Sequence, residues 1–246
     1  MKTFKYFLLV AMLPICHPAF AQYDDDGYYH PEYEPHNQTR YTDYHQTYYD
    51  DYSESWGDFY LEYSPLQWVS SAKDVKNRTF HTATIGYGYD FQLGEVPVYI
   101  EASFEASGAW HSQRYNDGTK YSMNLYFAKI PINLAYRWTL NDNFAIVPFG
   151  GAYVKWNIYG EEREKDSYGN TYKWELFDKN YTNDDDYNRF QLGYQAGLKL
   201  IIGNCLSIGA SWKADITSFC TYYDDWTNKE EKERFQGIAF HIGYCF

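Results

Sequence analysis

Residues 235–246 of the chain read FQGIAFHIGYCF and alternate between two kinds of side chain. Large apolar residues stand at every second position, namely Ile238, Phe240, Ile242, Tyr244 and Phe246. The positions between them hold Gly, Ala, His and Cys. Successive side chains of a β-strand point to opposite sides, so a period of two predicts a strand with one apolar face. This stretch is therefore expected to be a strand whose apolar side is covered by something other than water.

Seven earlier segments alternate in the same way, which predicts eight strands in all. They lie at residues 57–69, 79–91, 96–108, 120–139, 143–159, 187–202 and 205–217. The short turns QLGE, LNDN and GN alternate with longer connections, and the longest connection is 160–186. An antiparallel meander with an even number of strands places all short turns at one end. Ten strands are the alternative if residues 160–186 extend into a further hairpin above the membrane.

The polar face of the predicted strands resembles a crowded lumen more than a wet exterior. It is dense in Gly, Ser and Ala, and its few charges are of mixed sign. The apolar face carries Tyr and Trp near strand ends, as the interfacial aromatic girdle of a membrane barrel does. A soluble barrel would reverse the two faces. The sequence thus favours an all-β fold, an eight-stranded antiparallel up-and-down transmembrane β-barrel with a disordered N-terminal segment.

The first 56 residues differ in composition from the predicted barrel at 57–246. Residues 1–21 combine two lysines, an apolar core and the sequence AFA before Gln22, which predicts a secretory signal peptide. Residues 22–56 are crowded with Tyr and acids and contain no aliphatic residue. Such a segment cannot build a core, so we expect a loosely held periplasmic tail. A binding segment that uses its tyrosines as contacts is the alternative.

Nine charged residues on the polar phase are expected to meet inside the barrel. They are Glu62, Glu101, Glu105, Lys129, Arg137, Lys155, Lys199, Lys213 and Asp215. Eight strands leave an interior just wide enough for side chains to fill, and an unpaired buried charge is costly. We therefore predict a network of ion pairs that plugs the lumen, and a narrow charge-lined pore is the alternative.

Two cysteines fall where a cross-strand bridge is geometrically plausible. Cys205 opens the seventh strand and Cys245 closes the eighth, so both lie on the polar phase at the short-turn end. An exported protein folds where disulfides form. A Cys205–Cys245 disulfide is thus one hypothesis, and two buried free thiols are the other.

The sequence offers little support for catalysis or for a bound cofactor. It contains no Gly-rich phosphate loop, no Cys-x-x-Cys and no His-Glu-x-x-His motif, and its Asp runs lack the spacing of a calcium loop. His81 and His111 lie near the long-loop end, and no motif joins them to a serine and a carboxylate. The net charge of −12 disfavours nucleic acid as a partner. No catalytic residue, cofactor or metal site is therefore expected.

Residues 126–156, YFAKIPINLAYRWTLNDNFAIVPFGGAYVKW, carry a recognisable family pattern. The pattern residues are Ile130, Pro131, Leu134, Tyr136, Arg137, Pro148 and Gly151. This stretch resembles the porin-like outer-membrane β-barrel domain of Gram-negative bacteria, especially the Bacteroidetes type. The resemblance implies an outer-membrane location. It also implies that Ile242, Tyr244 and Phe246 form the signal read by the outer-membrane assembly machinery.

The expected role is a structural or surface-interaction function without catalysis. The long loops mix acids with aromatic side chains, a composition that suits contact with an extracellular ligand. Outer-membrane lipids and the assembly machinery are the other expected partners. Both chain ends are expected in the periplasm and the long loops outside the cell. A narrow channel for small solutes is the main alternative, and a lipid-modifying enzyme at the barrel rim is the second.

Overall fold

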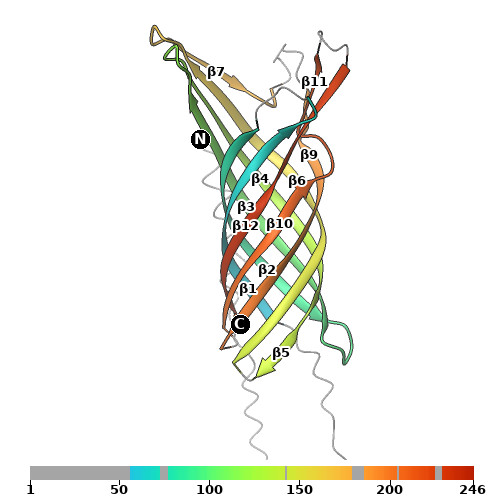
Figure 1. The fold of residues 1–246 in the computed structure, drawn as a ribbon. Coiled ribbons are helices and arrows are strands. Elements are labelled where there is room, and N and C mark those ends of the chain that lie inside the picture. The colour runs from blue at the N-terminus through green and yellow to red at the C-terminus, as the bar shows by residue number, and fades with distance from the viewer. Residues whose placement is uncertain (1–55, 73–76, 142, 179–185, 204, 225–228) are drawn as a thin grey trace, which may run out of the picture. The chain divides into compact units, whose positions relative to one another are not determined.

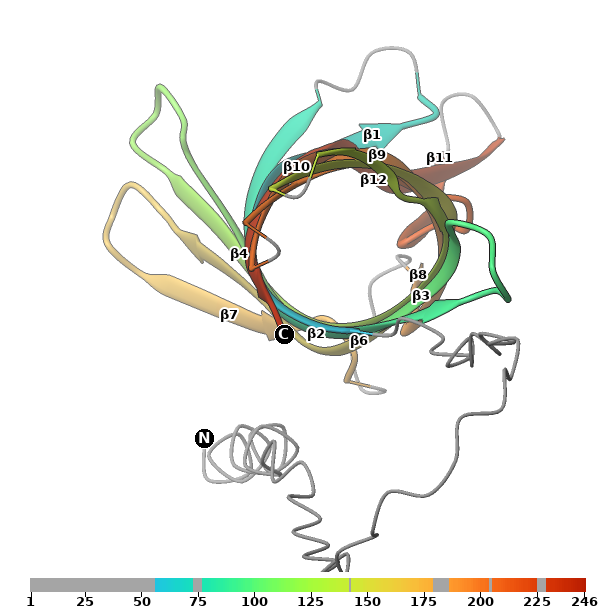
Figure 2. The ribbon, with the colours of Figure 1, turned by 90° about the horizontal axis from the view of Figure 1, so that it is seen from below.

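The strands of the computed structural model follow one another around a closed ring (Figures 1 and 2). The structure describes residues 56–72, 77–141, 143–178, 186–203, 205–224 and 229–246. The expected signal peptide at 1–21 and nearly all of the expected tail at 22–56 lie outside the described residues. The predictions about these two segments therefore stay predictions.

Eight long antiparallel strands form the barrel wall. They are β1 (Trp56–Ser70), β2 (Arg78–Gln92), β3 (Val98–Arg114), β4 (Lys120–Tyr136), β6 (Phe144–Lys165), β9 (Phe190–Ile202), β10 (Leu206–Asp215) and β12 (Lys229–Cys245). The first and last strands pair with each other, from Asp58 opposite Cys245 to Ser70 opposite Glu233. This pairing leaves the wall without an open edge, and the predicted eight-stranded barrel is confirmed.

Four short strands extend the sheet without entering the ring. They are β5 (Trp138–Asn141), β7 (Thr171–Glu175), β8 (Asp186–Tyr187) and β11 (Cys220–Asp224). Within the described residues β7 pairs with β6 alone, so the long connection adds a strand above the barrel and none to its wall. The further hairpin left open at 160–186 is thus present as the end of β6 and β7, and the wall keeps eight strands. Figure 1 shows β7 and β11 at the long-loop end and β5 at the opposite end.

Several strands run further than the alternation predicted. β6 continues to Lys165 instead of ending near residue 159, and β12 begins at Lys229 instead of near 235. The additional residues are mostly charged, for example GEEREK at 160–165. Backbone ladders hold these extensions together, as in the pairing of residues 161–165 with β7. Because no apolar face is buried there, the hydrophobic period gave no signal for them.

The two faces of the wall divide as the alternation predicted. On β4, Ile132 and Leu134 are 56% and 58% exposed on the outside, whereas Asn133 and Ala135 are 7% and 2% exposed on the inside. The same contrast recurs on the other long strands. The described residues contain no helix long and apolar enough to cross a membrane. An apolar outer belt around a polar interior is typical of a barrel that spans a membrane with its strands.

Candidate functional site: the barrel lumen

A lysine at the centre of the lumen joins acids from opposite parts of the wall. The Nζ of Lys213 on β10 lies 2.8 and 2.7 Å from the two carboxylate oxygens of Glu62 on β1. It also lies 3.4 Å from Oε1 of Glu105 on β3, and Lys129 on β4 forms an ion pair with the same glutamate. The hydroxyl of Tyr60 donates to Glu105 at 2.9 Å. This central cluster thus ties four strands together through buried charges.

Glycines opposite these large side chains make room for them. A Cβ atom on Gly86 would lie 2.2 Å from the ring of Tyr60, and one on Gly193 would lie 2.1 Å from the ring of Tyr153. No real Cβ atom approaches another atom so closely. Each glycine lies directly opposite its tyrosine on the neighbouring strand, so its missing side chain leaves room for the tyrosine ring to lie along the inner wall.

A second group of polar side chains gathers around Asp215 on β10. The Nζ of Lys155 lies 2.5 Å from Oδ2 of Asp215, and Tyr153 donates its hydroxyl to Oδ1 at 2.8 Å. Gln191 donates to Oδ2 at 3.0 Å and accepts a hydrogen bond from Asn157 at 2.9 Å. The carboxylate therefore has three donors, which is the condition under which a buried charge is tolerated.

A third group lies nearer the short-turn end. Lys199 on β9 pairs with Glu101 on β3, and Asn133 donates to the same carboxylate at 3.3 Å. Gln195 in turn donates to Asn133 at 3.0 Å. Together the three groups place eight of the nine predicted charged residues in buried lumen contacts.

Arg137, the ninth predicted residue, lies at the end of the barrel. It follows the last residue of β4, and its guanidinium carbon lies 4.4 Å from the centre of the Trp56 ring. Trp56 also contacts Tyr99, with 4.6 Å between ring centres. These rings adjoin a buried apolar cluster formed by Tyr99, Ala135, Ala145, Val147 and Ile201. Arg137 thus caps an apolar layer at the short-turn end.

Two inward acids were missing from the predicted network. Asp58 and Asp90 are each at most 5% exposed, and Ser207 donates to Asp58 at 3.4 Å. Both line a lumen cavity of about 50 Å³, together with Glu101, Lys199 and other residues. Their positions on the polar phase of β1 and β2 were the signal that could have identified them.

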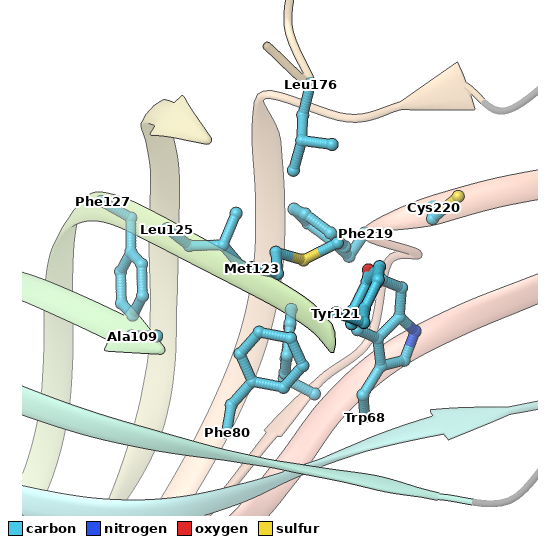
Figure 3. Packing of buried hydrophobic residues seen from close by; sticks show 11 residues of the cluster. Trp68, Phe80, Ala109, Tyr121, Met123, Leu125, Phe127, Leu176, Phe219 and Cys220 are labelled. Atoms are coloured by element: carbon cyan, nitrogen blue, oxygen red, sulfur yellow. The ribbon is translucent and has the colours of Figure 1, made fainter. Parts of the chain in front are cut away.

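The long-loop end of the lumen is closed by a cluster of apolar side chains (Figure 3). Its members are Trp68, Phe80, Ala109, Tyr121, Met123, Leu125, Phe127, Leu176, Phe219, Cys220 and Phe235. Phe219 comes from the β10–β11 connection, is fully buried, and has its ring centre 5.6 Å from that of Trp68. Leu176 enters from the segment after β7. We call this group the apolar cap.

The apolar cap was not predicted from the sequence. Its wall residues occupy the inward phase that lower in the barrel holds charges, so on β4 the period of two continues with its polarity reversed: Tyr121, Met123 and Leu125 are buried, and the polar Ser122 and Asn124 alternate with them. Figure 3 shows Phe219 and Leu176 pointing toward Met123 and Tyr121 from different parts of the chain. The alternation of residues within a strand does not predict which wall residues a loop side chain will contact. That contact depends on the three-dimensional path of the loop.

The histidines of the described barrel do not form a catalytic group. His81 lies on the outside, where its Nδ1 is 2.7 Å from the hydroxyl of Tyr63. His111 faces inward and donates from Nδ1 to the carbonyl oxygen of Thr79 at 2.8 Å. His241 lines the lumen cavity beside Tyr60, with 6.0 Å between ring centres. In the part of the chain that the structure describes, no three His, Cys, Asp or Glu side chains are arranged to hold a metal ion.

The cysteine pair is close in backbone but unbridged. The N–H of Cys245 donates to the carbonyl oxygen of Cys205 at 2.7 Å. Cys245 is buried, whereas Cys205 is exposed and directs its Sγ to the carbonyl of Ile202 at 3.8 Å. Both thiols are free, so the disulfide suggested by the spacing is not formed in this structure. The reason is that Cys205 precedes β10 and its side chain turns away from β12.

The residues of the expected assembly signal lie on the outer face of the closing strand. Ile242 and Tyr244 are exposed among the apolar belt, and Phe246 exchanges backbone hydrogen bonds with Gly57 at 2.8 and 3.0 Å. Their position is compatible with recognition from outside the barrel. Their role in assembly stays a prediction.

Solved structures with low identity resemble the chain. The attachment invasion locus protein Ail of Yersinia pestis, solved with the heparin analogue sucrose octasulfate, is 12% identical; the match covers 78% of this chain and 99% of Ail, with a TM-score of 0.42. Neisserial surface protein A is 9% identical over 77% of this chain and 96% of its own, with a TM-score of 0.43. The outer membrane enzyme PagL is 11% identical over 75% and 97%, with a TM-score of 0.34. A comparison with curated proteins gives no match.

The family described as "Outer membrane protein beta-barrel domain" matches residues 63–216. The match runs from the middle of β1 to the residue after β10, which is most of the barrel wall. It confirms the resemblance found in the sequence and places the protein in the outer membrane. The chain belongs to the outer-membrane-protein β-barrel domain family.

Proposed function

We propose that the protein is a non-conducting, non-catalytic outer-membrane barrel that presents its long strand extensions to partners outside the cell. One observation carries the proposal: the lumen is filled by side chains of the wall and the loops. The apolar cap closes the long-loop end, and three ion-paired groups fill the interior below it. In this orientation the long loops face the exterior, and the first and last residues of the barrel, Trp56 and Phe246, face the periplasm.

The apolar cap opposes ion passage more strongly than a ring of charges would. Phe80, Met123 and Phe219 are each 0% exposed. An ion that crossed this layer would lose its water without gaining polar contacts, which costs many kcal/mol. Two cavities lined by described lumen residues measure about 50 and 20 Å³, enough for isolated water molecules. These features support a closed barrel over the narrow solute channel.

The polar contacts of the histidines support a role without catalysis. The hydrogen-bond partners of His81 and His111 are a tyrosine hydroxyl and a backbone carbonyl. A hydrolytic site would pair a histidine with a serine and a carboxylate. His111 and Ser112 also lie on opposite faces of β3, because neighbours in a strand point apart. The described residues therefore do not bring together the histidine, serine and carboxylate that a rim-located hydrolytic enzyme would use.

The long strands provide the surface that would meet a partner. β6 spans 22 residues, whereas a strand that only crosses the membrane needs about 9 to 11. Exposed aromatic side chains lie on the extensions and their tips, such as Tyr168 at 91% exposure and Tyr172 at 50%. Exposed tyrosines offer large contact area at a low cost in side-chain entropy.

Planar-bilayer recording tests the closed lumen. Purified protein refolded into detergent and inserted into a bilayer at neutral pH is expected to give no steady open level. A heat-modifiability gel on the same sample verifies that the barrel is folded. A steady conductance from folded protein would overturn the proposal in favour of the channel.

Cysteine labelling in intact cells tests the orientation separately. Ser167 lies in the β6–β7 turn and Glu95 in the short β2–β3 turn, and both are exposed. In a Cys205→Ser background, a membrane-impermeant maleimide is expected to label Ser167→Cys in whole cells. Glu95→Cys is expected to react only after lysis. The opposite labelling pattern would reverse the orientation without reopening the lumen.

A further inference from the structure

Four strands continue together beyond the long-loop end of the barrel and splay away from its ring (Figure 2). This sheet consists of the ends of β3 and β4, the end of β6, and β7, which pair in that order. Its two hairpin tips are close, since a Cβ on Gly118 would lie 3.8 Å from the Cβ of Ser167. We call it the overhanging sheet.

One side of the overhanging sheet gathers basic residues. Arg114 on β3 lies directly opposite Lys120 on β4 in the strand register, and Lys120 lies opposite Lys165 on β6. Two residues nearer the barrel along β6, Arg163 lies directly opposite Lys173 on β7. The basic face consists of Arg114, Lys120, Arg163, Lys165 and Lys173.

The basic face continues the membrane-facing side of the barrel. Successive side chains of β3 point alternately inward and outward. Arg114 is therefore on the same outer side as Trp110, as are all even-numbered residues of this strand. The same reasoning places Lys120 on the outer side with Tyr126. A register shift between Tyr126 and Phe127 brings Tyr159 opposite Tyr126. Below the shift the even-numbered residues of β6 lie outside, and beyond it the odd-numbered residues do. The basic side chains therefore point in the same direction as the apolar belt.

The depth of the basic face matches the lipid headgroups. Trp and Tyr side chains of membrane proteins concentrate at the boundary between acyl chains and headgroups. Residues two and four positions past Trp110 lie about 7 and 14 Å further along the strand. Ser112 and Arg114 occupy these positions on β3, in the rows of Arg163 and Lys165 respectively. Both rows of the basic face thus lie beyond the aromatic boundary, on the headgroup side of the apolar belt.

The upper row of the basic face lacks countercharges. Within the described residues, Arg114, Lys120 and Lys165 form no ion pair. Glu161 and Glu175 lie on the same side two rows below the upper row, and Glu161 already contacts Arg163 and Lys173. The turn acids Asp117 and Asp166 accept hydrogen bonds from their own turns. Like charges directly opposite each other destabilise a sheet, so an anion placed between them would stabilise this row.

We propose that the basic face binds phosphate groups of the glycolipid headgroups in the outer leaflet beside the barrel. The charge is complementary, the side chains point over the membrane, and the face is continuous with the apolar belt that acyl chains cover. A soluble polyanion would have no need of that continuity. The inference rests on the orientation given under "Proposed function", in which the overhanging sheet lies on the outer side.

Native mass spectrometry of the folded protein, titrated with diphosphoryl lipid A, tests the inference. The variant Lys120→Gln/Lys165→Gln removes two adjacent charges of the basic face. Lys229→Gln/Lys232→Gln is the matched control, since it removes two lysines from the extension of β12. Each basic residue near an anionic surface contributes about a fivefold change in affinity. We expect about 20- to 30-fold weaker binding for the first variant and none of this loss for the control.

Three outcomes would overturn the proposal. Equal losses in the two variants would indicate an effect of net charge alone. Equal binding of dephosphorylated lipid A would show that acyl chains and sugars suffice. Tighter binding of a soluble sulfated glycan than of diphosphoryl lipid A would assign the face to a different partner. Because the assay uses purified protein, it does not depend on the labelling test of orientation or on conductance.

A stability measurement provides a second check. In a zwitterionic detergent without anionic lipid, Lys120→Gln relieves the repulsion with its two basic neighbours. The thermal midpoint of this variant is expected to rise slightly above that of the wild type. With diphosphoryl lipid A present, the order is expected to reverse. An unchanged order in both conditions would contradict the role of phosphate as the bridging group.

Discussion

The lumen is closed in two chemically different ways, and the two differ in what holds them together. The apolar cap packs rings against rings, with Phe219 and Phe235 centres 5.2 Å apart. The groups below it pair charges, with Lys213 held between Glu62 and Glu105. Apolar packing stabilises the fold through the area that it removes from water. A buried ion pair adds little net stability, yet the loss of one partner is severe because the other charge stays buried.

The largest expected effect comes from removing one buried charge. Lys213→Ala leaves Glu62 without its partner and weakens the pairing of Glu105, which should cost about 3–5 kcal/mol. Urea unfolding in lipid vesicles measures the change. The double variant Glu62→Gln/Lys213→Met removes the pair as a unit and should recover most of the loss. If the double variant is less stable than the single one, the ionic layer does not behave as a set of coupled pairs.

The apolar cap should respond to truncation in a simpler way. Phe219→Ala removes a fully buried ring, and the expected loss is at the lower end of the ~3–5 kcal/mol typical of such changes, since a loop residue leaves room for collapse. Urea unfolding again gives the value. Tyr168→Ala at the exposed β6–β7 tip serves as the control and should change stability little. Equal stability of the two variants would mean that Phe219 does not pack as described.

Overfilling the ionic layer should give an intermediate effect. Gly86→Ala places a methyl group 2.2 Å from the Tyr60 ring, and the displaced ring should cost about 1–3 kcal/mol. Gly108→Ala is the matched control, because its nearest side-chain atom would lie at 3.5 Å. The two midpoints of thermal unfolding provide the comparison. A stable Gly86→Ala protein would show that the lumen has space which the structure does not contain.

An exposed ion pair on the overhanging sheet should matter least. The hydrogen bond from Arg163 lowers the pKa of Glu161 below its ordinary value of 4.5. A lowered pKa in the folded state stabilises the fold above the ordinary pKa, and this contribution is lost as the pH falls through the folded value. Glu161→Gln should therefore lower the thermal midpoint slightly at pH 6, and this effect should shrink as the pH falls through the folded-state pKa of Glu161. A shift that stays constant as the pH falls would exclude the ionised carboxylate as the cause.

The charged residues of the lumen could largely be predicted from the sequence. Lysines and acids at alternate positions, such as Lys129 and Glu105, were placed inside the barrel correctly because a period of two leaves only one choice of face. Asp58 and Asp90 carried the same signal and were overlooked. The position of Arg137 depended on where β4 ends, which the alternation does not define.

The apolar cap and the basic face were beyond the reach of the pattern for different physical reasons. Phe219 reaches the wall from a loop, so its contacts depend on the three-dimensional path of the chain. The row of Arg114, Lys120 and Lys165 depends on strand register, including the shift next to Tyr126. Neither the path of a loop nor the position of a bulge can be predicted from the periodicity of the sequence.

The most direct test of the closed lumen is planar-bilayer recording of barrels in which the layers are opened one at a time. We expect no steady conductance for Phe80→Ala/Phe219→Ala, because the paired charges still fill the interior. We also expect none for Glu62→Ala/Lys213→Ala, because the apolar cap remains. The combined variant should conduct. A steady open level in the wild type, or in either partial variant, would contradict the claim that each layer closes the barrel by itself.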